Sequence, residues 1–370
     1  MLHAATLSRL RLSHHARLLG VLCALGVLVT SAACGSSSDA IGDGGAAVPS
    51  SGEAGRIYVT VAKEDSVVVI DEPSHTVHGK IAVGKGPAII LATPDKAQLY
   101  TANWADNTVS AITIATEKVV SIPTPGRPYV IAMAPAGDFV YAGLASNKVL
   151  VIDTATRQVA RMIPTSALPA SIIVSRDGKT LYIATIQGTL EALTAATGAQ
   201  AWDPITVGSA PAWITISPDG KKLYTLNFLS DDVSVVDIAS WKVTATVSTG
   251  KGSQAIIGNV TPDSAFLYVT NYGTGNMLAI DTSTNMIAST YPLDGRPVGV
   301  NFNTDGSRVY VVDFGPKSLS MPADTTFLLT GSFKTTDPGQ VSVFDTATGK
   351  LVGSKLTVGA GPTSVVFIPK

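Results

Sequence analysis

The chain has 370 residues and is almost neutral, with 26 Lys and Arg against 27 Asp and Glu, and only 14% of its residues are charged. Hydrophobic residues make up 45% of the chain and its mean hydropathy is +0.31, which excludes a disordered chain and a basic nucleic-acid-binding protein. The 34 Gly and 21 Pro residues favour many short strands and turns over long helices.

Residues 1–33 are predicted to form an export signal. Arginines precede an apolar run of about 12 residues from Leu18 to Val29, and no acidic residue occurs before Asp39. A helix needs ~20 apolar residues to span a bilayer, so this run is too short for a transmembrane segment. It has the length of the hydrophobic part of a cleaved signal.

The predicted signal is followed by Cys34, which we expect to carry a lipid. The sequence Ser31-Ala-Ala-Cys34 resembles the lipobox of bacterial lipoproteins, in which the cysteine is lipidated and becomes the first mature residue. Ser31 departs from that pattern, which usually has an aliphatic residue there, and a plain secretory signal is the alternative. Cys23 lies within the signal, so Cys34 would be the single mature cysteine. Residues 34–55, rich in Gly and Ser, are predicted to be this lipidated cysteine and a flexible tether.

An internal repeat of about 42 residues occupies the rest of the chain. Within one repeat, four runs of alternating apolar and polar residues are separated by turns; in the fifth repeat they are residues 213–217, 222–226, 233–237 and 243–247. Four such strands in about 42 residues are typical of a β-propeller blade. Each repeat is marked by a tyrosine that follows an apolar residue: Tyr58, Tyr100, Tyr141, Tyr182, Tyr224, Tyr268 and Tyr310.

The two ends of the repeat region are predicted to meet. The chain enters the first repeat at its tyrosine strand, residues 56–60, so this repeat lacks an innermost strand. Residues 363–369 have the pattern of the missing strand, and pairing them with residues 56–60 removes an exposed sheet edge. The sequence therefore predicts an all-β fold over residues 56–370: a seven-bladed β-propeller with four-stranded blades, closed by the C-terminal strand joining the first blade.

The repeat resembles that of the YVTN family of propeller proteins. Tyr268-Val-Thr-Asn271 is the motif itself, and Tyr100-Thr-Ala-Asn103 and Tyr224-Thr-Leu-Asn227 are close to it. Asp345-Thr-Ala-Thr-Gly349 and Val358-Gly-Ala-Gly-Pro362 are also similar to the family's repeat. The resemblance covers residues 56–370 and includes the YncE-like extracytoplasmic proteins of bacteria. It implies the seven-bladed fold but no single activity, because propellers host many unrelated functions.

The polar residues that recur in the repeats are predicted to be structural. Aspartates that end the third strand would accept hydrogen bonds from the following turn, and aspartates of the Pro-Asp-Gly type turns would close tight hairpins. Asparagines that end the second strand are expected to adopt a left-handed turn conformation. The aspartates that end the third strand are Asp71, Asp153, Asp237, Asp281 and Asp345, and those of the Pro-Asp-Gly type turns are Asp95, Asp177, Asp219, Asp263 and Asp305. The residues that end the second strand are Asn103, Asn227 and Asn271, with Asp313 in the last repeat.

Residues that differ between blades gather in the blade-to-blade loops and the second-to-third-strand loops, which share one face of a propeller around the channel mouth. Basic residues stand at what we take to be equivalent places in four of these loops, among aromatic and polar residues. Such a ring is predicted to bind a small anionic or carbohydrate-like ligand, or an acidic loop of a protein partner. The alternative is a solvated face with Lys and Arg stems lying over apolar groups. The candidate residues are Lys85, Trp104, Arg127, Tyr129, Trp213, Phe228, Lys251, Gln254, Tyr272, Arg296, Asp313 and Phe314.

The last blade carries a predicted inserted loop, residues 314–340. About 30 residues separate Tyr310 from Val341, where other repeats have about 8 or 9. Long loops in compact domains are usually functional or disordered. Because Phe327, Leu328 and Leu329 are apolar, we expect this loop to dock on the ring or to bind a partner on the same face.

Few residues suit metal or cofactor chemistry, and the sequence predicts neither a metal nor a cofactor. His75 and His78 are the only histidines outside the signal and have no cysteine partner, which does not favour a zinc or copper site. The sequence has no Cys-x-x-Cys-His haem motif, no histidine placed for a Ser-His-Asp triad and no glycine-rich phosphate loop between a strand and a helix. Catalytic residues stay unidentified.

Three functions fit these features, and the sequence favours the first. It is an exported, lipid-anchored, non-enzymatic propeller in the periplasm or at the cell surface, which contacts the membrane through its N-terminal lipid and binds a protein partner or a small anionic ligand, without nucleic acid. The second, implied by the resemblance, is a lactonase-like hydrolase or dehydrogenase-associated subunit. In it, Arg127, Arg296 and Gln254 would polarise a carbonyl, and a carboxylate such as Asp313 or Asp231 would be the base or a cation ligand. The third is a structural component of the envelope or surface layer.

Overall fold

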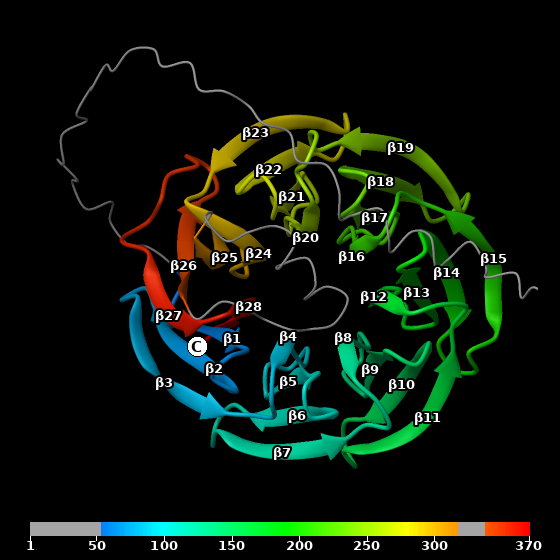
Figure 1. The fold of residues 1–370 in the computed structure, drawn as a ribbon, viewed down its shortest axis with the longest axis horizontal. Helices are drawn as coiled ribbons and strands as arrows, with labels where there is room; N and C mark the ends of the chain where they lie inside the picture. Colours follow the sequence, from blue (N-terminus) through cyan, green and yellow to red (C-terminus); the bar gives the residue numbers. More distant parts are fainter. Residues whose placement is uncertain (1–52, 317–336) are drawn as a thin grey trace, which may run out of the picture. The chain divides into compact units, whose positions relative to one another are not determined.

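The computed structural model describes residues 53–316 and 337–370. In these residues every regular element is a β-strand, and the strands form seven antiparallel sheets of four strands each, arranged in a ring (Figure 1). No helix in this part of the chain is long and apolar enough to cross a bilayer. The predicted all-β, seven-bladed propeller is confirmed.

Blades are numbered in chain order, and their strands are given from the innermost to the outermost. Blade 1 contains β28 (Pro362–Pro369), β1 (Gly55–Val61), β2 (Ser66–Glu72) and β3 (Thr76–Ala82). Blade 2 contains β4 (Pro87–Ala92), β5 (Gln98–Asn103), β6 (Thr108–Thr113) and β7 (Lys118–Pro123). Blade 3 contains β8 (Pro128–Met133), β9 (Phe139–Leu144), β10 (Lys148–Asp153) and β11 (Gln158–Pro164). Blade 4 contains β12 (Pro169–Val174), β13 (Thr180–Thr185), β14 (Thr189–Thr194) and β15 (Gln200–Thr206). Blade 5 contains β16 (Pro211–Ile216), β17 (Lys222–Asn227), β18 (Asp232–Asp237) and β19 (Lys242–Ser248). Blade 6 contains β20 (Ala255–Val260), β21 (Phe266–Asn271), β22 (Asn276–Asp281) and β23 (Met286–Pro292). Blade 7 contains β24 (Gly295–Phe302), β25 (Arg308–Pro316), β26 (Pro338–Asp345) and β27 (Leu356–Ala360).

The burial of each strand follows its position in the blade. The second and third strands, such as β21 and β22, are buried on both faces because each blade packs between two neighbours. The fourth strands lie at the rim, and most of their side chains are exposed, as in β19. Each innermost strand contacts the innermost strand of the next blade around the whole ring. The apolar core therefore lies between the blades.

The seven repeated tyrosines are part of these interfaces. All seven are buried. Tyr310 stacks on Phe367 of blade 1 at 5.6 Å between ring centroids, and Tyr182 stacks on Trp241 of blade 5 at 5.7 Å. Burial raises the pKa of Tyr182 and Tyr224 to about 12, so these hydroxyls stay neutral at physiological pH. The recurrence of tyrosine reflects packing between neighbouring blades.

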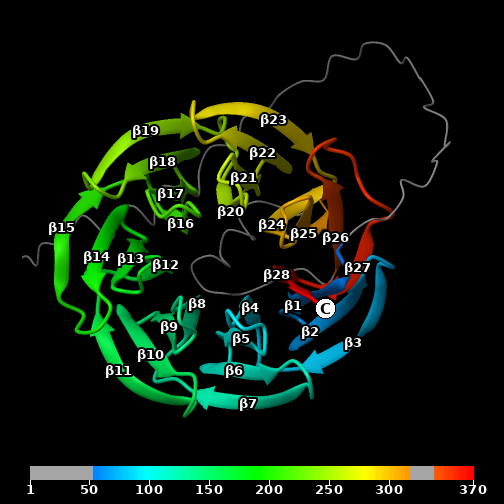
Figure 2. The ribbon, with the colours of Figure 1, turned by 180° about the vertical axis from the view of Figure 1, so that it is seen from behind.

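The C-terminal strand closes the ring, as predicted. β28 pairs antiparallel with β1, with Tyr58 opposite Val366, and the view from behind in Figure 2 shows β28 beside β1. Beyond this pair, Lys370 N donates a hydrogen bond to Ala54 O at 2.9 Å. The Glu53 carboxylate also accepts a hydrogen bond from blade 7. Residues 53–55, at the end of the predicted tether, are therefore part of the ring.

The loops between strands divide into two sets on opposite faces of the ring. Turns between first and second strands lie beside turns between third and fourth strands; Thr282 N, for example, donates to Ala265 O at 3.0 Å. We call this side the turn face. Loops between second and third strands lie beside the connections from one blade to the next, and we call that side the loop face.

Aspartates organise the first-to-second-strand turns of the turn face. In each of the five predicted turns, the aspartate accepts a hydrogen bond from the backbone N–H two residues later. In blade 6, Asp263 Oδ1 accepts from Ala265 N at 2.9 Å and from Thr261 Oγ1 at 2.6 Å. The bond from the Thr261 hydroxyl holds the pKa of Asp263 below its usual value. The structural role predicted for this set is confirmed.

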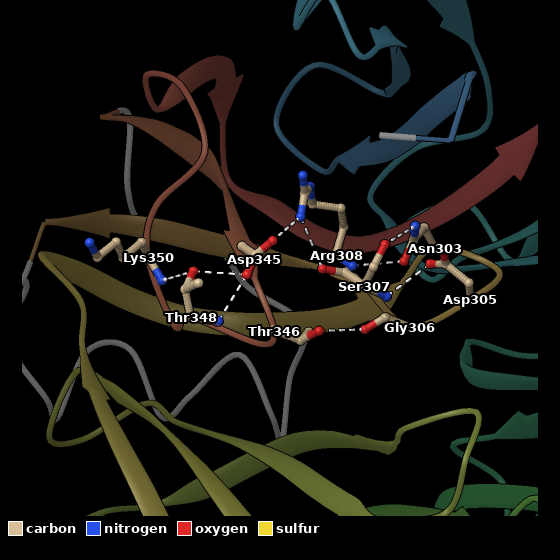
Figure 3. A network of polar contacts seen from close by, with 9 residues as sticks. All are labelled: Asn303, Asp305, Gly306, Ser307, Arg308, Asp345, Thr346, Thr348 and Lys350. Carbon is tan, nitrogen blue, oxygen red and sulfur yellow. Dashed lines mark hydrogen bonds and ion pairs between the residues drawn. The ribbon is translucent and has the colours of Figure 1, made fainter. Parts of the chain in front are cut away.

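Aspartates that end the third strand close the next turn in the same way. Asp345 Oδ1 accepts from Thr348 N at 2.9 Å and from its hydroxyl at 2.8 Å (Figure 3). Asp153, Asp237 and Asp281 make the equivalent backbone bonds. Asp71 is the exception to the prediction, because its carboxylate accepts a hydrogen bond from Arg56 and contacts His78.

The left-handed conformation predicted for Asn103, Asn227 and Asn271 is wrong. None of the three has a positive φ, and all are buried. Their side chains tie the second strand to the third: Asn227 Nδ2, for example, donates to an aspartate and a serine of β18 at 2.6 and 2.9 Å. The left-handed residue instead lies directly before the third strand, where the chain has only Asp, Asn or Gly: Asp65, Asn107, Asn147, Gly188, Asp231 and Gly275.

Candidate functional site

The two sets of loops that carry the candidate residues are hydrogen-bonded to each other on the loop face. In blade 5, Phe228 N donates to Ala210 O at 3.1 Å, and in blade 6, Tyr272 N donates to Gln254 O at 3.1 Å. Each blade-to-blade connection is thus fixed against the second-to-third-strand loop of the blade that it enters. The structure places both sets of loops on one face.

The four basic residues do not occupy equivalent positions, which corrects the sequence interpretation. Arg127 and Arg296 directly precede equivalent prolines of the inner strand, Pro128 and Pro297, each paired with the residue at the corresponding place of the second strand, Leu144 and Asp313. Lys85 stands two residues before the equivalent Pro87, and Lys251 stands four residues before the equivalent Ala255. The connection that carries Lys251, residues 249–254, is longer than those that carry Lys85 and Arg127, residues 83–86 and 124–127. Lys85 and Arg127 nevertheless differ in place, although their connections are equally long.

Burial separates Arg296 from the other three basic residues. Lys85, Arg127 and Lys251 are exposed, whereas Arg296 is only 6% exposed. The Arg296 guanidinium donates to Tyr272 O at 3.0 Å and lies 5.2 Å from the centre of the Tyr272 ring. Arg296 therefore joins blade 7 to the loop of blade 6.

The aromatic candidates also divide by burial. Phe228, Tyr272 and Phe314 are buried and belong to one core cluster with residues of blades 1, 6 and 7. This placement corrects the expectation that they ring the channel mouth as contact residues. The half-buried aromatics are Trp104, Tyr129 and Trp213.

Arg127 and Trp104 form a paired surface group between blades 2 and 3. The Arg127 guanidinium carbon lies 5.7 Å from the centre of the Trp104 ring, within the range of a cation–π contact. Arg127 is exposed and Trp104 is half-buried. The pair presents a positive charge beside an apolar plane, an arrangement suited to an anionic group that carries an apolar body.

The carboxylates weighed as bases are held by the fold. Asp231 accepts hydrogen bonds from Gly252 N at 2.6 Å and from Gln254 N at 2.9 Å, so it fixes the connection into blade 6. Asp65 does the same for the connection into blade 2, accepting from Gly86 N at 2.9 Å. Asp313 is only 3% exposed and pairs in register with Pro297 of the inner strand.

The residues proposed for carbonyl polarisation are not brought together. Gln254, in the connection from blade 5 to blade 6, and Arg296, at the start of blade 7, both contact the Tyr272 backbone of blade 6. Arg127 lies with Trp104 between blades 2 and 3, on the other side of the ring (Figure 1). One substrate carbonyl cannot be held by all three.

Some predicted features fall outside the described residues or change their limits. Cys34 and most of the tether precede residue 53, and the apolar part of the predicted insertion lies in 317–336. The ends of the predicted loop belong to strands instead: Phe314 and the two residues after it continue β25, and β26 begins at Pro338. Deriving the insertion from repeat length alone could not show that the flanking strands are longer in this blade.

The two histidines of the described residues each contact a carboxylate of blade 1. His75 Nε2 lies 2.8 Å from Glu72 Oε2, and His78 Nδ1 lies 3.2 Å from Asp71 Oδ2. Across residues 53–316 and 337–370, no group of three or more His, Cys, Asp or Glu side chains is arranged to hold a metal ion.

Comparison with known proteins places this fold among its relatives. The profile of the YNCE-like β-propeller family matches residues 14–323. Antigen Lp49 of Leptospira interrogans serogroup Icterohaemorrhagiae serovar copenhageni (strain Fiocruz L1-130) is 23% identical over 249 residues, which cover 60% of this chain. The match spans only about half of that antigen, 54% of its length. Hydrazine synthase of Kuenenia stuttgartiensis has a similar fold, with a TM-score of 0.61 at 22% identity over 77% of this chain and 96% of that one.

Proposed function

This chain belongs to the YNCE-like β-propeller family, and on that premise we propose that it is an exported, lipid-anchored binding module. Its loop face would hold a protein partner or a small anionic ligand. Export and anchoring are supported by the signal-like first 33 residues and by Cys34 in its lipobox-like setting. The curated relative is named an antigen, which is compatible with a protein displayed outside the cytoplasm.

The observation that carries the binding role is the set of exposed cations on the loop face. Lys85, Arg127 and Lys251 come from three different blade-to-blade connections, and none of them forms an ion pair within the described residues. Arg127 also lies over the half-buried ring of Trp104. The recurring aspartates, in contrast, are hydrogen-bonded within the blades. Cations that the fold does not neutralise are available to an acidic partner or ligand.

Charge reversal on one face at a time tests this proposal. The full, anchored protein is cross-linked in intact cells, and captured proteins are quantified by mass spectrometry. One variant carries Lys85→Glu, Arg127→Glu and Lys251→Glu; the matched control carries the same change at three exposed lysines of the turn face, Lys96, Lys179 and Lys221. We expect the loop-face variant to lose about tenfold or more of the capture, equivalent to about 1.4 kcal/mol, and the control to retain it. Equal capture by both variants would contradict the proposal.

Anchoring has its own test at Cys34. Several acyl chains, at ~0.8 kcal/mol per buried CH₂, hold a protein firmly on a bilayer. We expect wild-type protein to sediment with membranes and to incorporate labelled palmitate, and Cys34→Ser to lose both properties. A plain secretory signal would leave the fractionation unchanged by this substitution. Cys23→Ser, within the predicted signal, is the matched control.

A further inference from the structure

Positively charged side chains bridge successive blades on the turn face. Arg161 of blade 3 donates to Ala195 O of blade 4 at 2.6 Å, and Lys222 of blade 5 donates to Thr282 O of blade 6 at 2.6 Å. The two acceptors are equivalent, because each is the residue directly after the third strand of its blade. Between blades 4 and 5, Arg176 fills a similar role by donating to backbone carbonyls of β16 and its turn.

The interface between blades 6 and 7 lacks such a bridge among the described residues. Phe266 opens β21 where Lys222 opens β17; each pairs with the aspartate that ends its third strand. The carbonyl equivalent to that of Thr282 belongs to Thr346, whose amide and hydroxyl bond within blade 7. Instead of a bridge, the interface has a pocket of about 200 Å³, lined by Thr261, Pro262, Asp263, Phe266, Tyr268, Asp305, Gly306, Thr346 and Ala347.

The lining of this pocket suits a positively charged group on an apolar stem. Asp263 and Asp305 contribute carboxylates, and hydrogen bonds from Thr261 and Ser307 hold their pKa values below the usual range, so both are ionised at neutral pH. Phe266 and Tyr268 supply aromatic walls, which attract cations through the ring quadrupole. Figure 3 shows the blade 7 side, with Asp305 and Thr346 held by their own turns.

We propose that this pocket between blades 6 and 7 binds the ammonium group of an alkylamine or of a partner's lysine side chain. The ligand would stand where Lys222 stands one interface earlier, with its ammonium near the turn carboxylates and the Thr346 carbonyl and its stem along Phe266 and Tyr268. A cavity of about 150 Å³ is enough to bind benzene, so the pocket has room for a four-carbon amine. The site lies on the turn face and does not depend on the function proposed for the loop face.

The proposal is tested by titrating the full protein with n-butylammonium chloride and, separately, with n-butanol, and following its NMR spectrum. We expect butylammonium to bind at least about tenfold more tightly than butanol, because the two share a stem but differ in charge. Nα-acetyl-lysine methylamide, titrated in the same way, distinguishes the sources: binding comparable to butylammonium supports a lysine side chain, and weaker binding supports a free amine. Equal affinity for butylammonium and butanol would overturn the proposal.

Phe266→Lys gives the sharper variant, since it supplies the bridge that the interface lacks. We expect it to abolish butylammonium binding and to raise the thermal midpoint of unfolding. Phe266→Leu, which keeps the pocket without adding a charge, should still bind butylammonium. Binding that persists unchanged in Phe266→Lys contradicts the proposal. If that variant does not fold, Asp305→Asn takes its place, with Asp219→Asn in the equivalent turn of blade 5 as control; only Asp305→Asn should weaken binding.

Discussion

The two faces of this propeller are built in different ways. On the turn face the same side chains recur from blade to blade: an aspartate closes each described first-to-second-strand turn from blade 2 to blade 7 except that of blade 3. On the loop face a left-handed residue before the third strand recurs in six blades, and a buried asparagine recurs in three, while the exposed side chains differ between blades. Repetition of side chains maintains the ring, and variation of side chains is where a binding specificity can arise.

The comparison extends to charge. Several basic residues of the turn face, among them Lys222 and Arg308, donate to carbonyls or carboxylates of the protein. Lys85, Arg127 and Lys251 of the loop face are exposed, and their side chains form no hydrogen bond within the described residues. Substitutions should therefore affect mainly stability on the turn face and mainly binding on the exposed loop face.

The largest expected loss of stability comes from Asp345→Asn on the turn face. Arg308 is only 5% exposed and its guanidinium donates to the Asp345 carboxylate (Figure 3). Removing the carboxylate charge leaves a buried guanidinium uncompensated, and breaking such a pair costs about 3 kcal/mol or more. Urea denaturation measures the change in the free energy of unfolding.

Asp237→Asn is the matched control for that substitution. Asp237 closes the same turn in blade 5, by bonds from Ser240 N and Oγ at 2.8 and 2.6 Å, and no buried arginine faces it with a hydrogen bond. We expect a loss of about 1 kcal/mol, the contribution of an ordinary hydrogen bond. Similar losses at both positions would show that the Arg308 pair adds nothing.

The next effect is expected on the loop face, but inside the blade. Asn227→Ala removes a buried amide that donates to Asp232 and Ser234, and leaving these acceptors without their partner should cost about 2 kcal/mol. Asn147→Gly is the control, because Asn147 is exposed and has φ of 57°, a conformation that glycine adopts freely. The unfolding free energy of the Asn147→Gly variant should stay within about 0.5 kcal/mol of wild type. A larger change would mean that the Asn147 side chain has a further role.

These substitutions also show which parts of the molecule the sequence can reveal. The seven blades and the closing strand are predictable because each depends on local signals: period-two strands, Asp turns and one tyrosine per blade. The left-handed residues are also predictable from the sequence, since only Asp, Asn or Gly stands directly before the third strand. The error placed them at Asn227, four residues too early, because an asparagine suits both a turn and a buried cross-strand bond.

The contacts between blades are harder to predict. Arg176 reaches Ser217, 41 residues away, and nothing near Arg176 in the chain shows whether its side chain points to solvent or to the next blade. Arg127 and Arg296 look alike in sequence, each before a proline, yet one is exposed and the other buried. The pocket between blades 6 and 7 was missed for the same reason. Aligning the repeats and noting Phe266 in the place of Lys222 was the available signal.

A smaller effect is expected in the pH dependence of stability, through an aspartate of the turn face. Hydrogen bonds from the Ser283 hydroxyl and nearby backbone lower the pKa of Asp281 to about 2, against about 3.9 for an unfolded aspartate. Because the folded-state pKa is the lower one, this stabilisation is complete above the unfolded value and is lost as the pH falls from about 4 to about 2. We expect the thermal midpoint of wild type to fall over that range, and Asp281→Asn to show a shallower fall. An identical slope in the variant would contradict this assignment.

The smallest change in stability is expected for Arg127→Ala on the loop face. Its cation–π contact with Trp104 is exposed and should contribute only about 0.5 kcal/mol. Arg296→Ala is the informative comparison, because Arg296 has the same place before a proline and also faces an aromatic ring, but is buried and donates to Tyr272 O. Losing a charged hydrogen bond there should cost about 2 kcal/mol. Urea denaturation of both variants then separates the two roles: near-wild-type stability with reduced capture identifies Arg127 as a binding residue, whereas a loss of stability equal to that of Arg296→Ala would make it a structural one.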